Sequence, residues 1–136
     1  MDDPAALLRR ESRSLVQRLR LWTPSRFAAQ VPGHGTRADL VHHLAQRLAD
    51  QAADAEGQPR RLLPRLEGDL VLPDQLAVTA DDLARVADPA PARAATAHLL
   101  LHRRDLLDEN IPPGLAGALG LADVVATGRE ECSQSR

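Results

Sequence analysis

The sequence contains no lysine and no tyrosine, so all 17 of its basic residues are arginines. Without lysine the chain cannot form a Schiff base or use the lysine of a phosphate-binding P-loop. Trp22 and Phe27 are the only aromatic residues besides histidine, so the stacking surface that single-stranded nucleic acids require is missing. The net charge is only −2, whereas nucleic-acid binding needs a basic face. We therefore expect no nucleic-acid partner.

Cysteine and long apolar runs are also scarce. The single cysteine, Cys132, has no partner for an internal disulfide, which predicts a reducing, cytoplasmic setting. The acidic start at residues 1–4 lacks the basic opening of a signal peptide. The longest uncharged apolar stretch, residues 111–122, contains two prolines and is too short to cross a bilayer. The expected protein is small and cytoplasmic, with no membrane partner, and Cys132 has no predicted role.

The residues that are abundant favour α-helix. Alanine, leucine and arginine dominate a chain of 136 residues that is 43% hydrophobic, which is enough apolar material for one buried core. We predict a single helical domain over residues 1–127, followed by a flexible tail over residues 128–136. The predicted fold class is all-α, with the helices arranged as a four-helix bundle.

The helix boundaries follow from apolar spacing and from the positions of proline and glycine. The expected main helices cover residues 4–22, 36–57, 73–88 and 91–108, and a short extension contains Leu115, Leu119 and Leu121. The clearest start is at Thr36, the predicted N-cap, with Asp39 three residues later in a capping box. Residues 58–72 predict an irregular connection with one helical turn around Leu62 and Leu63.

Two histidines in the last main helix could bind a metal ion. His98 and His102 are four residues apart, so they lie on one helical face, with Asp105 beside them. Such an i, i+4 pair is a common way for a helix to offer two ligands to one ion. The same spacing also arises by chance in helical chains, in which case these histidines are ordinary core or surface residues.

The second main helix offers a third imidazole. His43 lies at the edge of its apolar stripe, so we expect it to lean into the interior, whereas His42 should be solvated. Three histidines from two helices would leave a coordination position open for water or substrate. His34, between two glycines, is interpreted as a loop residue.

The chain also resembles a known family. Residues 23–27 and 31–45, with the run His43-Leu44-Ala45, resemble the DinB-like superfamily and in particular its mycothiol-dependent maleylpyruvate isomerase branch. His98 and His102, followed by Asp105-Leu106, match that family's last bundle helix, and the resemblance covers roughly residues 5–109. Two features depart from the pattern, which marks a shortened member: His34 replaces the usual tryptophan, and the region of the third helix is short.

This resemblance implies a four-helix bundle that holds a divalent metal, zinc or nickel, on His43, His98 and His102. It implies a thiol cosubstrate, such as mycothiol, that binds the metal as thiolate and attacks a small electrophilic substrate. The predicted function is accordingly a metal-dependent, thiol-using transferase or isomerase. Asp105 would lie next to the ligands and fix an imidazole tautomer, or it would pair with Arg103 or Arg104.

A non-catalytic alternative stands beside this function. Leu100 and Leu107 are predicted to point away from the helical face that carries His98. Either residues 111–125 cover these leucines, or the leucines form an apolar patch that pairs with a second copy of the chain. In the second case the protein is a helical interaction module or homodimer.

Overall fold

The computed structural model describes residues 3–65, 68–108, 113–118 and 120, and in these ranges the chain is mostly α-helical, which confirms the all-α class. The elements are α1 (Pro4–Leu19), α2 (Pro24–Phe27), β1 (Gln30–Val31), β2 (Gly35–Thr36), α3 (Arg37–Ala55), the 3-10 helix η1 (Asp69–Val71), α4 (Leu72–Ala84), α5 (Pro89–Leu107) and α6 (Pro113–Ala118). The two strands form a small antiparallel hairpin. The predicted tail over residues 128–136, with Cys132, lies outside the described residues.

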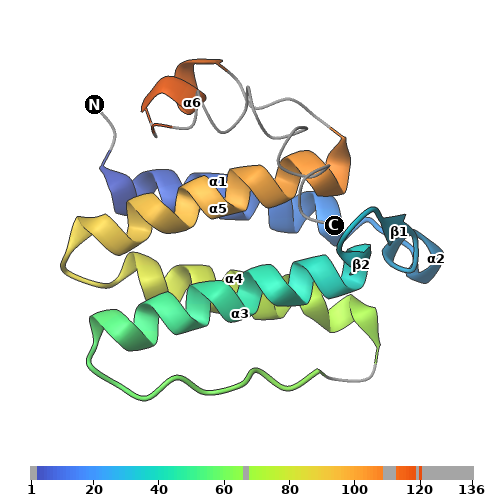
Figure 1. Ribbon diagram of the computed structural model, residues 1–136, viewed down its shortest axis with the longest axis horizontal. Helices are drawn as coiled ribbons and strands as arrows, with labels where there is room; N and C mark the ends of the chain where they lie inside the picture. The colour runs from blue at the N-terminus through green and yellow to red at the C-terminus, as the bar shows by residue number, and fades with distance from the viewer. Residues whose placement is uncertain (1–2, 66–67, 109–112, 119, 121–136) are drawn as a thin grey trace.

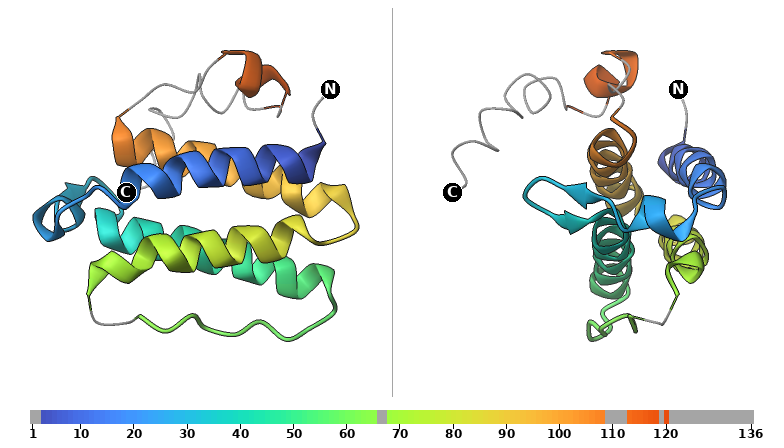
Figure 2. Two further views of the ribbon diagram at one scale, coloured as in Figure 1. Left: turned by 180° about the vertical axis from the view of Figure 1, so that it is seen from behind. Right: turned by 90° about the vertical axis from the view of Figure 1, so that its right-hand side faces the viewer.

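Four long helices pack side by side around one core (Figures 1 and 2). Helix α1 contacts α4 and α5, and helix α3 also contacts α4 and α5, so each long helix has two main neighbours. Helices α1 and α5 run in one direction, whereas α3 and α4 run in the other (Figure 1). The consecutive helices α3 and α4 are therefore parallel neighbours, and the chain must return along their length between them.

This return is made by an extended segment, residues 58–65, which we call the strap. The backbone N–H of Leu63 donates to the Gln46 side-chain oxygen at 2.7 Å, and the Gln46 amide nitrogen donates to the Arg61 carbonyl at 3.0 Å. The helical turn expected around Leu62 and Leu63 is thus wrong. The Gln46 side chain hydrogen-bonds to backbone groups of the strap and so stabilises its extended form. In addition, Pro64 disfavours a helical conformation at Leu63, the residue before it.

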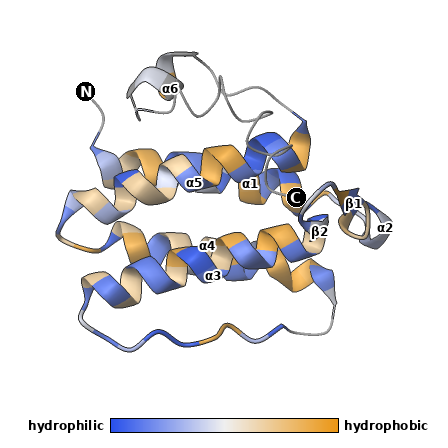
Figure 3. Cartoon of the chain, in the orientation of Figure 1, coloured by the Kyte–Doolittle hydropathy of each residue, from blue (hydrophilic) through white to orange (hydrophobic). Residues whose placement is uncertain are grey.

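Leucines from all four long helices fill the core, and the apolar residues of each helix are shown in Figure 3. The fully buried leucines are Leu8, Leu15, Leu19, Leu40, Leu44, Leu48, Leu72, Leu76, Leu83, Leu99 and Leu106. Helix α1 ends at Leu19, three residues before the predicted end at Trp22. Trp22 is buried nonetheless, because its ring packs edge-to-face on Phe27 with the centroids 5.2 Å apart.

The start of α3 confirms the predicted capping box. The Asp39 N–H donates to the Thr36 hydroxyl at 3.0 Å, and the Thr36 N–H donates to the Asp39 carboxylate at 3.1 Å. The hydrogen bond from the Thr36 backbone lowers the pKa of Asp39, and Arg65 acts in the same direction. Helix α5 begins at Pro89 rather than Pro91, because Asp88 caps it and both prolines then fall in the first turn, where proline is tolerated.

The two leucines of α5 for which either cover or an exposed patch was predicted are not exposed. Leu100 is only 3% exposed, and Leu107 is partly buried against the core. The residues expected to cover them, 111–125, fall largely outside the described ranges. No helix in the described part of the chain has both the length and the apolar character needed to span a bilayer.

Candidate functional site

The outer seam between α3 and α5 brings two of the predicted ligands together. The two helices run antiparallel, and the His43 ring from α3 stacks on the His102 ring from α5. Their ring centroids are 5.8 Å apart and their planes are inclined by 24°. His43 is exposed and His102 is half-buried. The imidazole pair therefore lies at the surface, where solvent and small molecules can reach it.

The backbone of α5 holds His102 in one tautomer. Its Nδ1 lies 2.7 Å from the His98 carbonyl oxygen, and because a carbonyl only accepts, Nδ1 must carry the proton. Burial lowers the pKa of His102 to about 4, and the nearby His43 and His98 add to this effect. The ring is therefore neutral at pH 7, and its Nε2 carries no proton. A neutral imidazole oriented by a bond from its other nitrogen is the form that binds metal ions.

His98, the third predicted ligand, is half-buried one turn earlier on α5. Burial lowers its pKa, and the positive charge of Arg47 on α3 lowers it further. In the described residues no three His, Cys, Asp or Glu side chains are grouped so that they could hold a metal ion. Of the predicted ligand set, the structure thus assembles the His43–His102 pair, and metal binding stays a prediction.

Asp105 pairs with a cation and approaches a fourth histidine. Its carboxylate lies 3.4 Å from Arg104 Nε, in line with the predicted pairing with Arg104. The other carboxylate oxygen is 3.7 Å from His34 Nε2, on the turn between β1 and β2. The sequence predicts only that His34 lies in a loop. The flanking glycines, Gly33 and Gly35, were the sequence signal for a tight turn that presents this side chain. In the structure both have positive φ, 82° and 81°.

The expected roles of His42 and His43 are corrected by the structure. His42, predicted to be solvated, is half-buried, and its Nε2 lies 3.2 Å from the Leu63 carbonyl oxygen. His43, expected to lean inward, is exposed. The strap buries His42, because it covers the face of α3 that the apolar periodicity of that helix leaves to solvent.

A polar cavity of about 400 Å³ opens beside His43. Its lining residues are His43, Gln46, Arg47, Asp50, Gln51 and Arg60. Arg60 contributes a charge that is already compensated, since its guanidinium makes two hydrogen bonds to Asp54, at 2.7 and 3.0 Å. This cavity gives a small polar molecule room next to the imidazole pair.

Comparisons with models of protein families, with curated proteins and with solved structures each found no match to this chain. The likeness to the DinB-like superfamily therefore rests on the residues quoted for it, above all His43, His98 and His102.

Proposed function

We propose that the four packed helices form a DinB-like bundle that binds one divalent metal ion, zinc or nickel, on His43, His98 and His102. The observation that carries this proposal is the imidazole pair, in which His43 and His102 meet across two helices with the His102 tautomer fixed for metal binding. As a cytoplasmic protein it would act on a small electrophilic substrate with a thiol cosubstrate such as mycothiol.

The donor set fits a borderline-soft metal, which imidazole nitrogen binds readily. His43 and His102 would hold the ion, and His98 would be the third ligand because it lies one turn from His102 on the same helix. The positive charge of Arg47 disfavours a cation at this site, because the charge is close enough to lower the pKa of His98. Its side chain is exposed and flexible, so the guanidinium can turn toward solvent when a cation binds.

When bound, the metal would lower the pKa of a thiol so that it is a nucleophile at neutral pH. The chain's own groups would position the reactants. The polar cavity beside His43 has room for the polar body of the thiol, and Gln46 and Arg47 line it. His34 and Asp105, at the end of the seam, are ionisable groups that can exchange a proton with a substrate beside His102.

Zinc titration by calorimetry tests the proposal on protein purified without a histidine tag. The wild type should bind one ion per chain. His98→Ala and His102→Ala should lose this binding while the circular dichroism spectrum keeps its helical signal, because alanine favours helix. His42→Ala is the matched control on α3, since His42 contacts the strap, and it should bind zinc like the wild type. A wild type that binds no zinc, or His98→Ala with unchanged affinity, would contradict the proposed site.

One of the two leucines that suggested the alternative function, an interaction module or homodimer, is not exposed. Leu100 is buried, so it cannot be part of an exposed apolar patch on α5. Homodimerisation itself stays a prediction, and light scattering over a wide range of protein concentrations measures it directly.

A further inference from the structure

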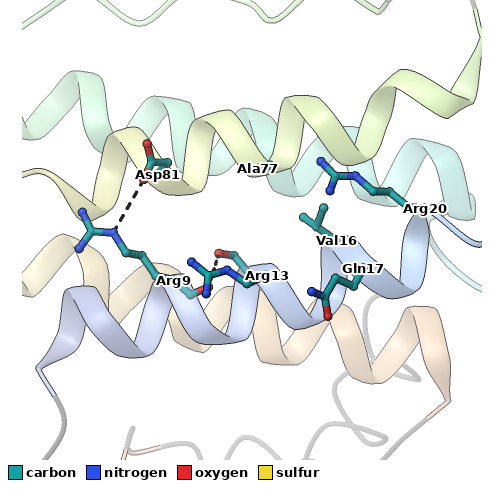
Figure 4. Close-up of a pocket in the computed structure, with 8 residues that line it drawn as sticks. Arg9, Arg13, Val16, Gln17, Arg20, Ala77 and Asp81 are labelled. Carbon is teal, nitrogen blue, oxygen red and sulfur yellow. Dashed lines mark hydrogen bonds and ion pairs between the residues drawn. The ribbon is translucent and has the colours of Figure 1, made fainter.

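Helices α1 and α4 lie on the face of the molecule opposite α3 and α5 (Figure 2), and a groove opens between them (Figure 4). The groove has a volume of about 330 Å³, within the range typical of small-molecule sites. Its rim is arginine-rich, with Arg9 and Arg13 on α1 and Arg20 as the C-cap residue of the same helix. At about 100° per residue these three lie within roughly 40° of each other on the helix, so they form one stripe along the groove.

Ion pairs close the two ends of this groove. Arg9 Nε lies 3.8 Å from the Asp81 carboxylate at one end, and Arg20 Nη2 lies 3.0 Å from the Asp74 carboxylate at the other. Since α1 and α4 run antiparallel, the middle of the stripe faces the middle of α4. The carboxylates of α4 therefore compensate the outer arginines and leave the central one without a counter-charge from that helix.

Arg13 is this central arginine. Between the two aspartates, α4 contributes Ala77 to the groove, whose side chain can accept no hydrogen bond. In the described part of the chain Arg13 makes no ion pair, and its side chain is exposed. It also lies one helical turn from Arg9, an unfavourable spacing for two like charges. An anion bound at this point would relieve the repulsion.

The floor of the groove is apolar apart from the Ser12 hydroxyl. Val16 is 3% exposed and Ser12 is 6% exposed, and the Ser12 hydroxyl donates to the Arg9 carbonyl at 3.2 Å instead of facing a ligand. Ala77 is small, which leaves the space between the helices open. A ligand that matches both surfaces carries an oxyanion for the guanidiniums and a compact apolar body for the floor.

We propose that the α1–α4 groove binds a small molecule of this kind, with a phosphate or carboxylate group on Arg13 and its apolar body on Val16 and Ala77. A guanidinium donates two parallel hydrogen bonds to either oxyanion, so it suits both groups. This site is independent of the imidazole pair, which lies on the α3–α5 face.

Calorimetric titration with phenyl phosphate and with benzoate tests the proposal and separates the two oxyanions. At least one of them should bind saturably at one per chain, whereas the neutral analogue benzyl alcohol should not bind. Arg13→Gln should weaken binding about tenfold or more, because a charge-assisted pair is lost. Arg93→Gln removes the same charge at an exposed position of α5 outside the groove, and it should leave the affinity unchanged.

Ala77→Glu provides a second variant that keeps all the arginines. It would place a carboxylate opposite Arg13, so the affinity for phenyl phosphate and benzoate should fall as it does in Arg13→Gln while the helices stay folded. Equal affinity in the wild type and both groove variants would overturn the proposal. An equal loss in Arg93→Gln would also overturn it, since binding would then follow net charge rather than the groove.

Discussion

Acidification should destabilise the fold through His102. The folded chain lowers the pKa of this ring from 6.5 to about 4, chiefly because the ring is buried, so the native state favours the neutral form. The contribution of the neutral ring to stability is fully present above pH 6.5, and it is lost progressively as the pH falls from 6.5 to 4. The full shift corresponds to about 3 kcal/mol, of which about 2 kcal/mol is lost between pH 7 and pH 5.

Urea unfolding of the wild type and of His102→Gln, both in the presence of a chelator, measures this effect. Glutamine is neutral at every pH, so the wild type should lose about 2 kcal/mol more than the variant between pH 7 and pH 5. In an NMR titration the ring resonance that disappears in the variant should have its midpoint near 4. Equal losses in the two proteins, together with a midpoint near 6.5, would refute the assignment of a buried, neutral His102.

Three further predictions test local features of the fold. Thr36→Ala should lower the free energy of unfolding by about 1 kcal/mol, because it removes the hydroxyl of the capping box, and an unchanged urea midpoint would contradict this. Gln46→Ala should speed tryptic cleavage within the strap, since two hydrogen bonds to its backbone are lost, and cleavage at the wild-type rate would show that the strap is held otherwise. Gly35→Ala should destabilise more than Gly33→Ala, by about 1 kcal/mol in urea unfolding. Both glycines have positive φ, but only at Gly35 would the new Cβ lie 2.7 Å from the carboxylate of the capping box, so equal effects would refute the clash.

Features set by neighbouring residues were predictable from the sequence. The start of α3 could be predicted from Thr36 and Asp39 alone, because the side chain of each residue accepts a hydrogen bond from the backbone N–H of the other within one turn. Gly57, with φ of 68°, follows the end of α3 as expected. The helix boundaries shifted by a few residues where two signals lay close together, as at Pro89 and Pro91.

Features that depend on packing between distant segments were not predictable in this way. Helical periodicity correctly placed His42 outside the apolar stripe, but it gave no sign that Leu63, 21 residues away, would cover it. The sequence of the strap shows no regular spacing of apolar residues that would indicate its structure. Its extended form is held by hydrogen bonds to side chains of other elements. The meeting of His43 with His102 likewise requires knowing that α3 and α5 are neighbours, which the apolar stripes alone do not determine.

The parallel course of α3 and α4 sets a minimum length for the connection between them. Helix α3 has 19 residues, so it rises about 28 Å, and an extended chain needs roughly nine residues to return over that distance. Residues 56–68 provide this span with a few to spare. Short deletions in this region should be tolerated, whereas a connection cut to a tight turn could join only antiparallel helices and would force the chain to exchange the places of α4 and α5. The length of the segment, more than its composition, thus determines which helix packs against which.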